Sequence, residues 1–210
     1  MGDSGSEFSH FIPEPRNFAE VTRLSENIKK PWLKENLKEI QNIINNQNFL
    51  IEDQNEGELV APCMDVYKTK IKSDGSLDKL KLVIAVRGDL QNKELDGDTW
   101  SPRASMRTFK YFLAEAAKHK AIVHQLDFIG SFLDAKVKNR VFVKLDIRCT
   151  DYFPEHAKYF GRALRLLKSM YGMTNSGKLF ADELTEWLLE AGFIQSLCHM
   201  SIYYKFAPYG

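Results

Sequence analysis

Asp127 is the residue whose type and position most directly suggest chemistry. It lies near the end of residues 121–128, an otherwise mostly apolar run with the length of a buried strand. A carboxylate at such a strand end is costly unless it is paired, hydrogen-bonded or bound to a cation. Two interpretations follow: an aspartate that caps a strand end, or a ligand for a hard cation.

Residues 66–88 carry a concentration of positive charge. They contain six basic residues against Asp74 and Asp78, a local charge of +4 in a chain whose net charge is +1. One interpretation is a solvated hairpin whose lysines protect its edge from aggregation. The other is a finger that faces phosphate groups. The basic residues are Lys68, Lys70, Lys72, Lys79, Lys81 and Arg87.

Residues 161–178 form a second basic stretch. Arg162, Arg165, Lys168 and Lys178 occur there with no acidic residue between them, again a local charge of +4. Asn175 precedes Ser176 at the expected start of a helix, where free N–H groups favour anions. The stretch is either an anion-binding or nucleic-acid-binding segment, or an ordinary capped helix with a basic lead-in.

Composition argues against several classes of protein. Apolar residues make up 44% and charged residues 27%, as in soluble globular proteins. The longest aliphatic run, residues 82–86, is too short to span a membrane, and no signal peptide precedes it. The three cysteines lack the spacing of a zinc module or a disulfide framework. We therefore expect an intracellular protein that is not secreted and has no membrane partner.

The elements that must position these residues can be read from periodicity. Residues 1–16 are polar and predict a flexible tail. Residues 17–29 predict a helix, and a second helix is expected to hold Pro31 in its first turn and to end near residue 46. The Asp-Gly pair at residues 74–75 predicts a hairpin turn between strands 64–72 and 80–86.

The second half mixes helices and strands without strict alternation. Ser101 and Pro102 predict the start of a helix, and Ser176 predicts the start of another that ends before Gly192. The first of these helices has an apolar stripe that is expected to be buried, and it consists of Met106, Phe109, Leu113 and Ala116. Strands are expected at residues 121–128, 140–144 and 201–206. This mixture predicts an α+β fold.

Short motifs follow one another along the chain in a specific order. They are SDGSLDKLK at residues 73–81, RGDLQ at 87–91, TWSP at 99–102, MRT at 106–108, HQLDF at 124–128, SFL at 131–133, LLKSMYGM at 166–173, GF at 192–193 and HMS at 199–201. Their order and spacing resemble the reverse transcriptase of Ty1/copia-type retrotransposons, a part of a Pol polyprotein. The resemblance covers residues 17–210.

The resemblance implies a right-hand polymerase that synthesises DNA from deoxynucleoside triphosphates on a template. The hairpin would belong to the fingers, and Asp127 would lie in the palm as the first metal-binding aspartate, in a site for two Mg²⁺ ions. Lys81 would lie near the triphosphate, Phe132 below the sugar, and Asn175 beside the nucleotide. The implied partners are an RNA or DNA template-primer, the nucleotide and the remainder of the Pol polyprotein.

Several positions depart from the family pattern. Val83 stands where an arginine is usual, unless the alignment slips and Arg87 bends inward instead; Gly130 and Ser131 replace asparagine and alanine. The paired aspartates are expected after the last strand, but the sequence reaches Gly210 before them. We therefore expect a partial palm with one of three metal carboxylates.

Whether this chain is itself an enzyme stays open. It is either a fragment of an RNA-directed DNA polymerase or a degenerate, non-enzymatic transposon remnant with weak nucleic-acid binding. Whether the reading frame continues into Asp-Asp distinguishes the two.

Overall fold

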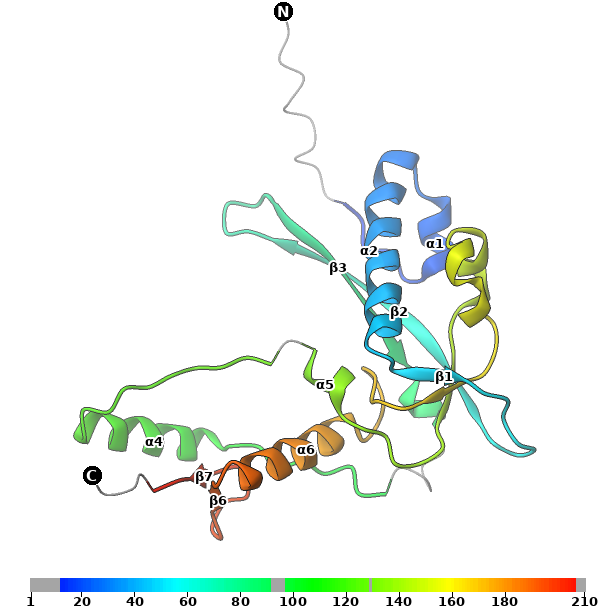
Figure 1. Cartoon of the computed structure of the whole chain (residues 1–210). Coiled ribbons are helices and arrows are strands. Elements are labelled where there is room, and N and C mark those ends of the chain that lie inside the picture. Colours follow the sequence, from blue (N-terminus) through cyan, green and yellow to red (C-terminus); the bar gives the residue numbers. More distant parts are fainter. Residues whose placement is uncertain (1–11, 92–96, 129, 207–210) are drawn as a thin grey trace, which may run out of the picture.

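A computed structural model describes residues 12–91, 97–128 and 130–206 (Figure 1). The protein has an α+β fold, as predicted, with a five-stranded mixed sheet, a separate two-stranded sheet and several helices. Within the described residues, no helix is long and apolar enough to span a membrane.

Two helices open the described chain. Helix α1 (Phe18–Arg23) begins at Asn17, whose side chain accepts a hydrogen bond from the backbone N–H of Glu20. It ends at Leu24, which has extended backbone, so the single helix predicted over residues 17–29 is wrong. Helix α2 (Glu26–Asn45) starts earlier than expected, and Pro31 lies inside it rather than in its first turn. One face of α2 is buried and consists of Trp32, Asn36, Ile40 and Ile43.

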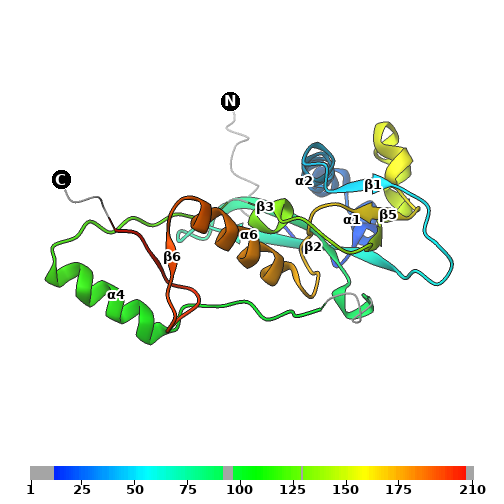
Figure 2. The same ribbon diagram turned by 60° about the horizontal axis from the view of Figure 1, so that its bottom comes forward.

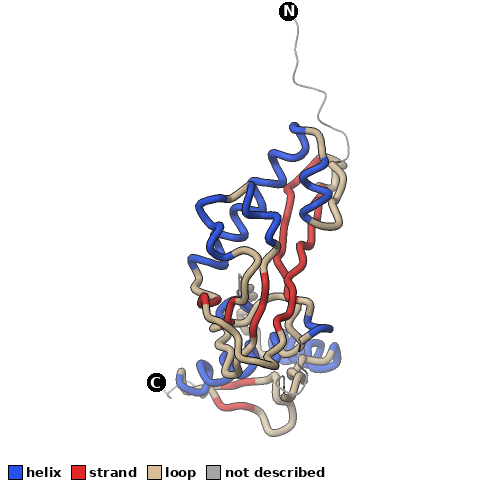
Figure 3. Tube along the Cα trace, turned by 90° about the vertical axis from the view of Figure 1, so that its right-hand side faces the viewer, coloured by secondary structure: helices blue, strands red, loops and turns tan. Residues whose placement is uncertain are grey.

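The predicted hairpin is confirmed. Strands β2 (Val60–Ile71) and β3 (Leu77–Val86) pair antiparallel and form the long twisted ribbon of Figure 3. Its turn depends on Gly75, whose φ is +84°, and on the Asp74 carboxylate, which accepts hydrogen bonds from the Ser76 N–H and hydroxyl. Tyr67 pairs with Leu82, and both are buried beside α2.

The large sheet has the strand order β1-β5-β4-β2-β3. Strand β4 (Phe142–Lys144), which falls inside the predicted strand 140–144, pairs parallel with β2 and antiparallel with β5 (Leu164–Leu166), and β1 (Phe49–Ile51) completes the edge. Phe142, Val143 and Leu164 are almost completely buried, so the core lies between this sheet and α2. The short 3₁₀ helix η1 (Gly88–Leu90) follows β3, and η2 (Ile147–Asp151) and η3 (Pro154–Tyr159) connect β4 to β5.

The region around α4 (Met106–Lys118) differs from expectation. Ser105 caps this helix by accepting a hydrogen bond from the backbone N–H of Thr108, so the predicted start at Ser101 and Pro102 is wrong. None of its residues is buried, and the predicted buried stripe of Met106, Phe109, Leu113 and Ala116 is wrong as well. Figures 1 and 2 show α4 apart from the large sheet. An apolar stripe indicates a face that favours burial, but no described segment covers it.

Residues 121–128 do not form the predicted strand. They are extended, exposed and without a strand partner among the described residues. A strand needs a neighbour to satisfy its backbone groups, and apolar composition alone does not supply one. In contrast, α6 (Ser176–Glu190) begins where predicted, and Gly192 follows it with a φ of +83°. Strand β7 (Tyr203–Tyr204) lies within the predicted strand 201–206 and pairs with β6 (Ile194–Gln195).

Part of the predicted tail is in contact with the hairpin. The Glu14 carboxylate accepts a hydrogen bond from the Thr69 N–H at 2.7 Å and pairs with the Lys68 ammonium at 3.0 Å, while Pro15 is buried. These contacts hold residues 12–16 against β2. Residues 1–11 of the predicted tail lie outside the described residues.

Candidate functional site

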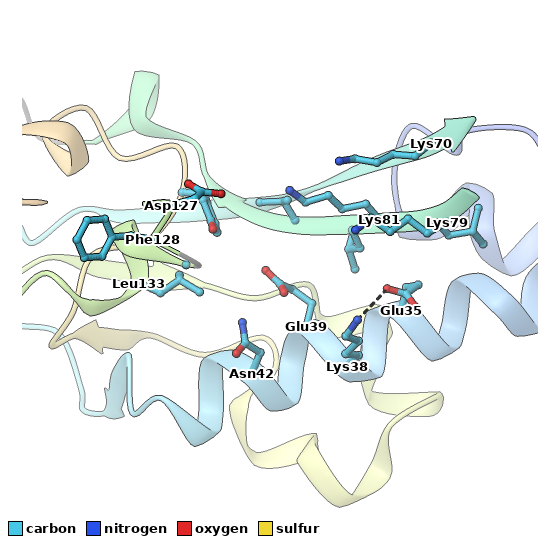
Figure 4. A pocket seen from close by; sticks show the side chains of 15 residues that line it. Glu35, Lys38, Glu39, Asn42, Lys70, Lys79, Lys81, Asp127, Phe128 and Leu133 are labelled. Atoms are coloured by element: carbon cyan, nitrogen blue, oxygen red, sulfur yellow. Dashed lines mark ion pairs between the residues drawn. The ribbon is translucent and has the colours of Figure 1, made fainter. Parts of the chain in front are cut away.

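A cavity of about 560 Å³ lies between α2, the hairpin and the segment that contains Asp127 (Figure 4). Helix α2 lines one wall with Glu35, Glu39 and Asn42, and β3 lines another with Lys79, Lys81 and Val83. Asp127 and Phe128 lie at one end. The structure therefore brings Lys81 and Asp127, both singled out in the sequence, to the same cavity.

The hairpin wall is positively charged. Cross-strand pairing places Lys70 opposite Lys79 and Lys68 opposite Lys81, so the four side chains share one face of the ribbon. Lys68 is paired with Glu14, whereas Lys70, Lys79 and Lys81 form no ion pair within the described part of the chain. The ammonium groups repel one another at this spacing, and an anion bound between them would offset the repulsion by attracting each of them.

Val83 lies on the same wall as Lys81. It is half-buried, lines the cavity and follows Lys81 by two residues along β3, so both side chains project to one side. Arg87, the alternative source of a guanidinium, donates from Nε and Nη2 to the Asp89 carboxylate at 2.8 and 2.6 Å. Arg87 does not line the cavity. The structure thus gives no support to the alternative in which Arg87 replaces the missing arginine.

The α2 wall carries a carboxylate that sequence reasoning missed. The pKa of the Glu39 carboxyl is raised because the group is buried. Hydrogen bonds from the Ile84 backbone and the Asn42 side chain, and the nearby charge of Lys81, act in the opposite direction but do not cancel this effect. Lys38 pairs with Glu35 at 3.9 Å on the same helix. The available signal was the polar spacing of Glu35, Glu39 and Asn42, which places them on one face of a helix.

Asp127 reaches the cavity from an exposed, extended segment rather than from a strand end. The cost of burying its carboxylate, which motivated both sequence interpretations, is therefore absent. Within the described residues, no group of three or more His, Cys, Asp or Glu side chains is arranged to hold a metal ion. Asp127 is one carboxylate without such a group around it.

Phe132 and Asn175 lie outside this cavity. Phe132, in the short helix α5 (Ser131–Asp134), makes edge contacts with the rings of Tyr171 and Phe180, with centroids 5.8 and 6.2 Å apart. Asn175 precedes α6, is 7% exposed and lines a different cavity together with Lys178. The structure does not bring these two residues together with Lys81.

The second basic stretch finds acidic partners elsewhere in the chain. Arg165 pairs with Glu52 at 2.9 Å, and Lys168 lies 3.9 Å from Asp134. Lys178 pairs with Asp182 one helical turn away. Arg162 is exposed, and so is Lys72, which lies at the hairpin turn. Counting charges along the sequence missed these partners because all three lie outside residues 161–178.

Comparisons with known proteins agree with the motif pattern. The family model described as reverse transcriptase (RNA-dependent DNA polymerase) matches residues 46–209. The retrovirus-related Pol polyproteins from transposons RE2 and RE1 of Arabidopsis thaliana are each 26% identical over 145 residues, which is 69% of this chain and 10% of each relative. The chain thus spans about a tenth of the length of these curated relatives. No solved structure matches the chain.

The family match runs from the end of α2 through the hairpin, the Asp127 segment and α6 to β7, well over half of the chain. It therefore includes Asp127 and the lysines of the cavity wall. The predicted resemblance is confirmed: this chain belongs to the reverse transcriptase (RNA-dependent DNA polymerase) family found in the Pol polyproteins of retrotransposons.

Proposed function

We propose that this chain is the nucleotide-facing part of a copia-type RNA-directed DNA polymerase, with the hairpin as its fingers and the Asp127 segment as part of its palm. One observation carries the proposal: Asp127 and three lysines free of ion pairs within the described residues line one cavity of about 560 Å³. A cavity of this size accommodates a nucleotide. Its partners would be a template-primer and the rest of the Pol polyprotein.

In this proposal, Lys70, Lys79 and Lys81 bind the phosphates of a deoxynucleoside triphosphate. Their ammonium groups are point charges that fit a flexible anion, but they lack the planar fork of an arginine. In the family reaction, the primer 3′-oxygen bonds to the α-phosphorus, the bond to the β-phosphate oxygen breaks, pyrophosphate leaves, and the hydroxyl proton passes to solvent. Asp127 would face the reacting end of the nucleotide.

Reverse transcriptases use divalent metal ions, and Asp127 is the residue we assign as a ligand for Mg²⁺. The described residues do not by themselves fit such an ion, because no group of three or more His, Cys, Asp or Glu side chains among them is arranged to hold one. The roles of Phe132 below the sugar and of Asn175 beside the nucleotide stay predictions.

A second candidate function is a non-enzymatic remnant that binds nucleic acid weakly. Two observations favour it: Val83 replaces the arginine of the family pattern, and acidic side chains pair with Arg165, Lys168 and Lys178. Under this alternative, the hairpin lysines contact nucleic-acid phosphates without selecting a nucleotide.

The test is a fluorescence titration of the purified chain with a labelled deoxynucleoside triphosphate. We expect saturable binding that weakens at least about 10-fold in the Lys79→Glu/Lys81→Glu variant, because two attractive contacts become repulsive. The matched control is Lys34→Glu/Lys110→Glu, which makes the same charge change at exposed lysines outside the cavity.

Equal loss in both double variants would refute the cavity as the nucleotide site. Salt-sensitive binding of DNA without saturable nucleotide binding would instead support the remnant.

A further inference from the structure

A second cavity, of about 440 Å³, lies between α6 and the segment around α5. We call it the acidic groove, and we call its aromatic lining residues the floor and its charged lining residues the rim. Its floor is aromatic: Phe128 and Phe180 meet edge to face with ring centroids 5.8 Å apart, and Trp187 lines the same floor while 59% exposed. Figure 1 shows α5 beside the N-terminal part of α6, and residue contacts between the two helices agree. Exposed aromatic side chains in a concave site are a typical feature of binding surfaces.

The rim of the acidic groove is negatively charged. Four carboxylates line it, those of Asp134, Glu183, Glu186 and Glu190, against the single cation of Lys136. The three glutamates recur at intervals of three and four residues, so they follow one face of α6. This local charge of −3 contrasts with the net charge of +1 for the whole chain.

Most of this negative charge is uncompensated. The Glu183 carboxylate accepts a hydrogen bond from the Lys136 N–H at 3.3 Å and has no ion pair within the described residues. Asp134 accepts a hydrogen bond from the Asn46 side chain at 3.2 Å and lies 3.9 Å from the Lys168 ammonium. Glu186 and Glu190 form no ion pair among the residues that the structure describes. The rim is therefore available to a cationic partner.

The C-terminal end of α6 lies at the Glu190 end of the groove. The C-terminal end of a helix carries a partial negative charge, which favours cations there. In α6 the last turn contains no basic residue and includes Glu190. The Lys205 ammonium donates a hydrogen bond to the Ala191 carbonyl at 2.7 Å at this end and offsets part of the helix dipole, so the preference for a cationic partner rests mainly on the glutamate carboxylates.

From the aromatic floor and the anionic rim, we propose that the acidic groove binds a basic peptide segment of a protein partner, in which lysine or arginine flanks an aromatic or aliphatic anchor. The anchor would cover Trp187, and the basic side chains would pair with Glu186 and Glu190. Nucleic acid does not fit, because its phosphates would face four carboxylates. This inference is independent of the proposed nucleotide site, which lies against the hairpin lysines.

The test is fluorescence anisotropy with a labelled 12-residue peptide in which lysines flank a central tryptophan and leucine. We expect the Kd to rise about 10-fold in Glu186→Lys/Glu190→Lys and about 5-fold in Trp187→Ala. Trp187 is largely exposed, so its truncation should leave the fold intact. Glu186→Gln/Glu190→Gln is a milder second variant, and circular dichroism verifies that each variant is folded.

Two controls isolate the groove from general electrostatics. Asp53→Lys/Glu56→Lys makes the same charge change in the exposed loop between β1 and β2 and should alter the Kd less than about 2-fold. A peptide with glutamate in place of lysine, and one without the apolar anchor, should bind far more weakly. Equal affinity for the three peptides, or equal losses in the groove and loop variants, would overturn the proposal.

Two further outcomes would assign the groove to another occupant and would also overturn the proposal. The first is binding of labelled single-stranded DNA that is lost in Trp187→Ala. The second is a concentration-dependent dimer, seen in sedimentation and lost in Glu186→Lys/Glu190→Lys, because it would identify a second copy of this chain as the partner.

Discussion

Replacing Asp65 by asparagine should stabilise the folded protein at neutral pH. Asp65 lies on β2 and lines a small internal cavity together with Cys63, Cys149 and Asp146. Burial raises the pKa of its carboxyl to about 6, and the charge of Asp146 adds to this effect.

The favourable contacts of Asp65 are weak. Its Oδ2 accepts a hydrogen bond from the Tyr67 hydroxyl at 3.3 Å, while Arg148 donates from Nε to Asp146 at 2.9 Å. Arg148 is thus engaged by a different carboxylate. The ionised form of Asp65 is therefore poorly compensated in the folded protein.

The magnitude follows from the difference between the unfolded and folded pKa values. An unfolded value of 3.8 and a folded value of about 6 mean that the folded state holds this proton more tightly. The contribution of Asp65 to the free energy of unfolding is then highest when its carboxyl is protonated, and this contribution falls as the pH rises from about 4 to above 6. About two pKa units correspond to an upper bound of roughly 3 kcal/mol. Asp65→Asn should recover up to this amount at pH 7.5 and almost none at pH 4.

The assay is urea unfolding monitored by circular dichroism at several pH values between 4 and 7.5. The quantity to compare is the difference in the free energy of unfolding between Asp65→Asn and the unaltered chain. The contributions of the other titrating groups cancel in this difference. Asp151→Asn is the matched control, since this aspartate is exposed and should leave that free energy unchanged. A pH-independent difference, or a loss of stability at pH 7.5, would refute the reasoning.

Further predictions concern the cavity and the backbone. Val83→Arg should tighten binding of a labelled deoxynucleoside triphosphate about 10-fold, because a guanidinium would join Lys81 on the same wall. The control Val83→Leu should leave the affinity unchanged. Equal affinities of the Val83→Arg variant and the unaltered chain would show that the missing arginine is no defect. The logarithm of the binding constant for single-stranded DNA should fall with the logarithm of the salt concentration with a slope of about −2, as three lysine contacts imply. The slope should be smaller in magnitude in Lys79→Glu/Lys81→Glu, and an affinity that does not depend on salt would contradict the lysine contacts. Gly172→Ala should lower the free energy of unfolding in urea by more than about 2 kcal/mol, because φ is +83° and a Cβ would lie 2.3 Å from a backbone oxygen of β3. Gly57→Ala, at a φ of +85° in open space, should cost about 1 kcal/mol; equal losses would argue against the close approach.

Much of the local structure could be predicted because its causes lie within a few residues. The Asp-Gly pair at residues 74–75 specifies a turn that only glycine adopts easily, and the flanking strands pair around it as expected. Helix α6 likewise begins at Ser176 and ends before Gly192. The family was recognisable for a similar reason, because ordered motifs are a property of the sequence alone.

The missed helix boundaries had competing local signals. Ser101-Pro102 and Ser105 both provide a capping residue before an apolar stripe, and only the structure shows that Ser105 accepts the hydrogen bond from Thr108. Residues 121–128 have the composition of a buried strand, but a strand depends on a neighbour that the composition does not identify.

By itself, then, the sequence determined the hairpin, the family and the lysines that face one side of the ribbon. Tertiary structure alone decided which basic side chains stay without an acidic partner in the described part of the chain. Glu52 pairs with Arg165, which lies 113 residues away in the sequence, and Glu14 pairs with Lys68, which lies 54 residues away. It also placed Glu39 of α2 opposite Lys81, and Asp127 at the end of the same cavity. The physical reason is that turns and helix caps depend on neighbours in sequence. Charge pairing and burial instead depend on segments that meet only when the chain folds.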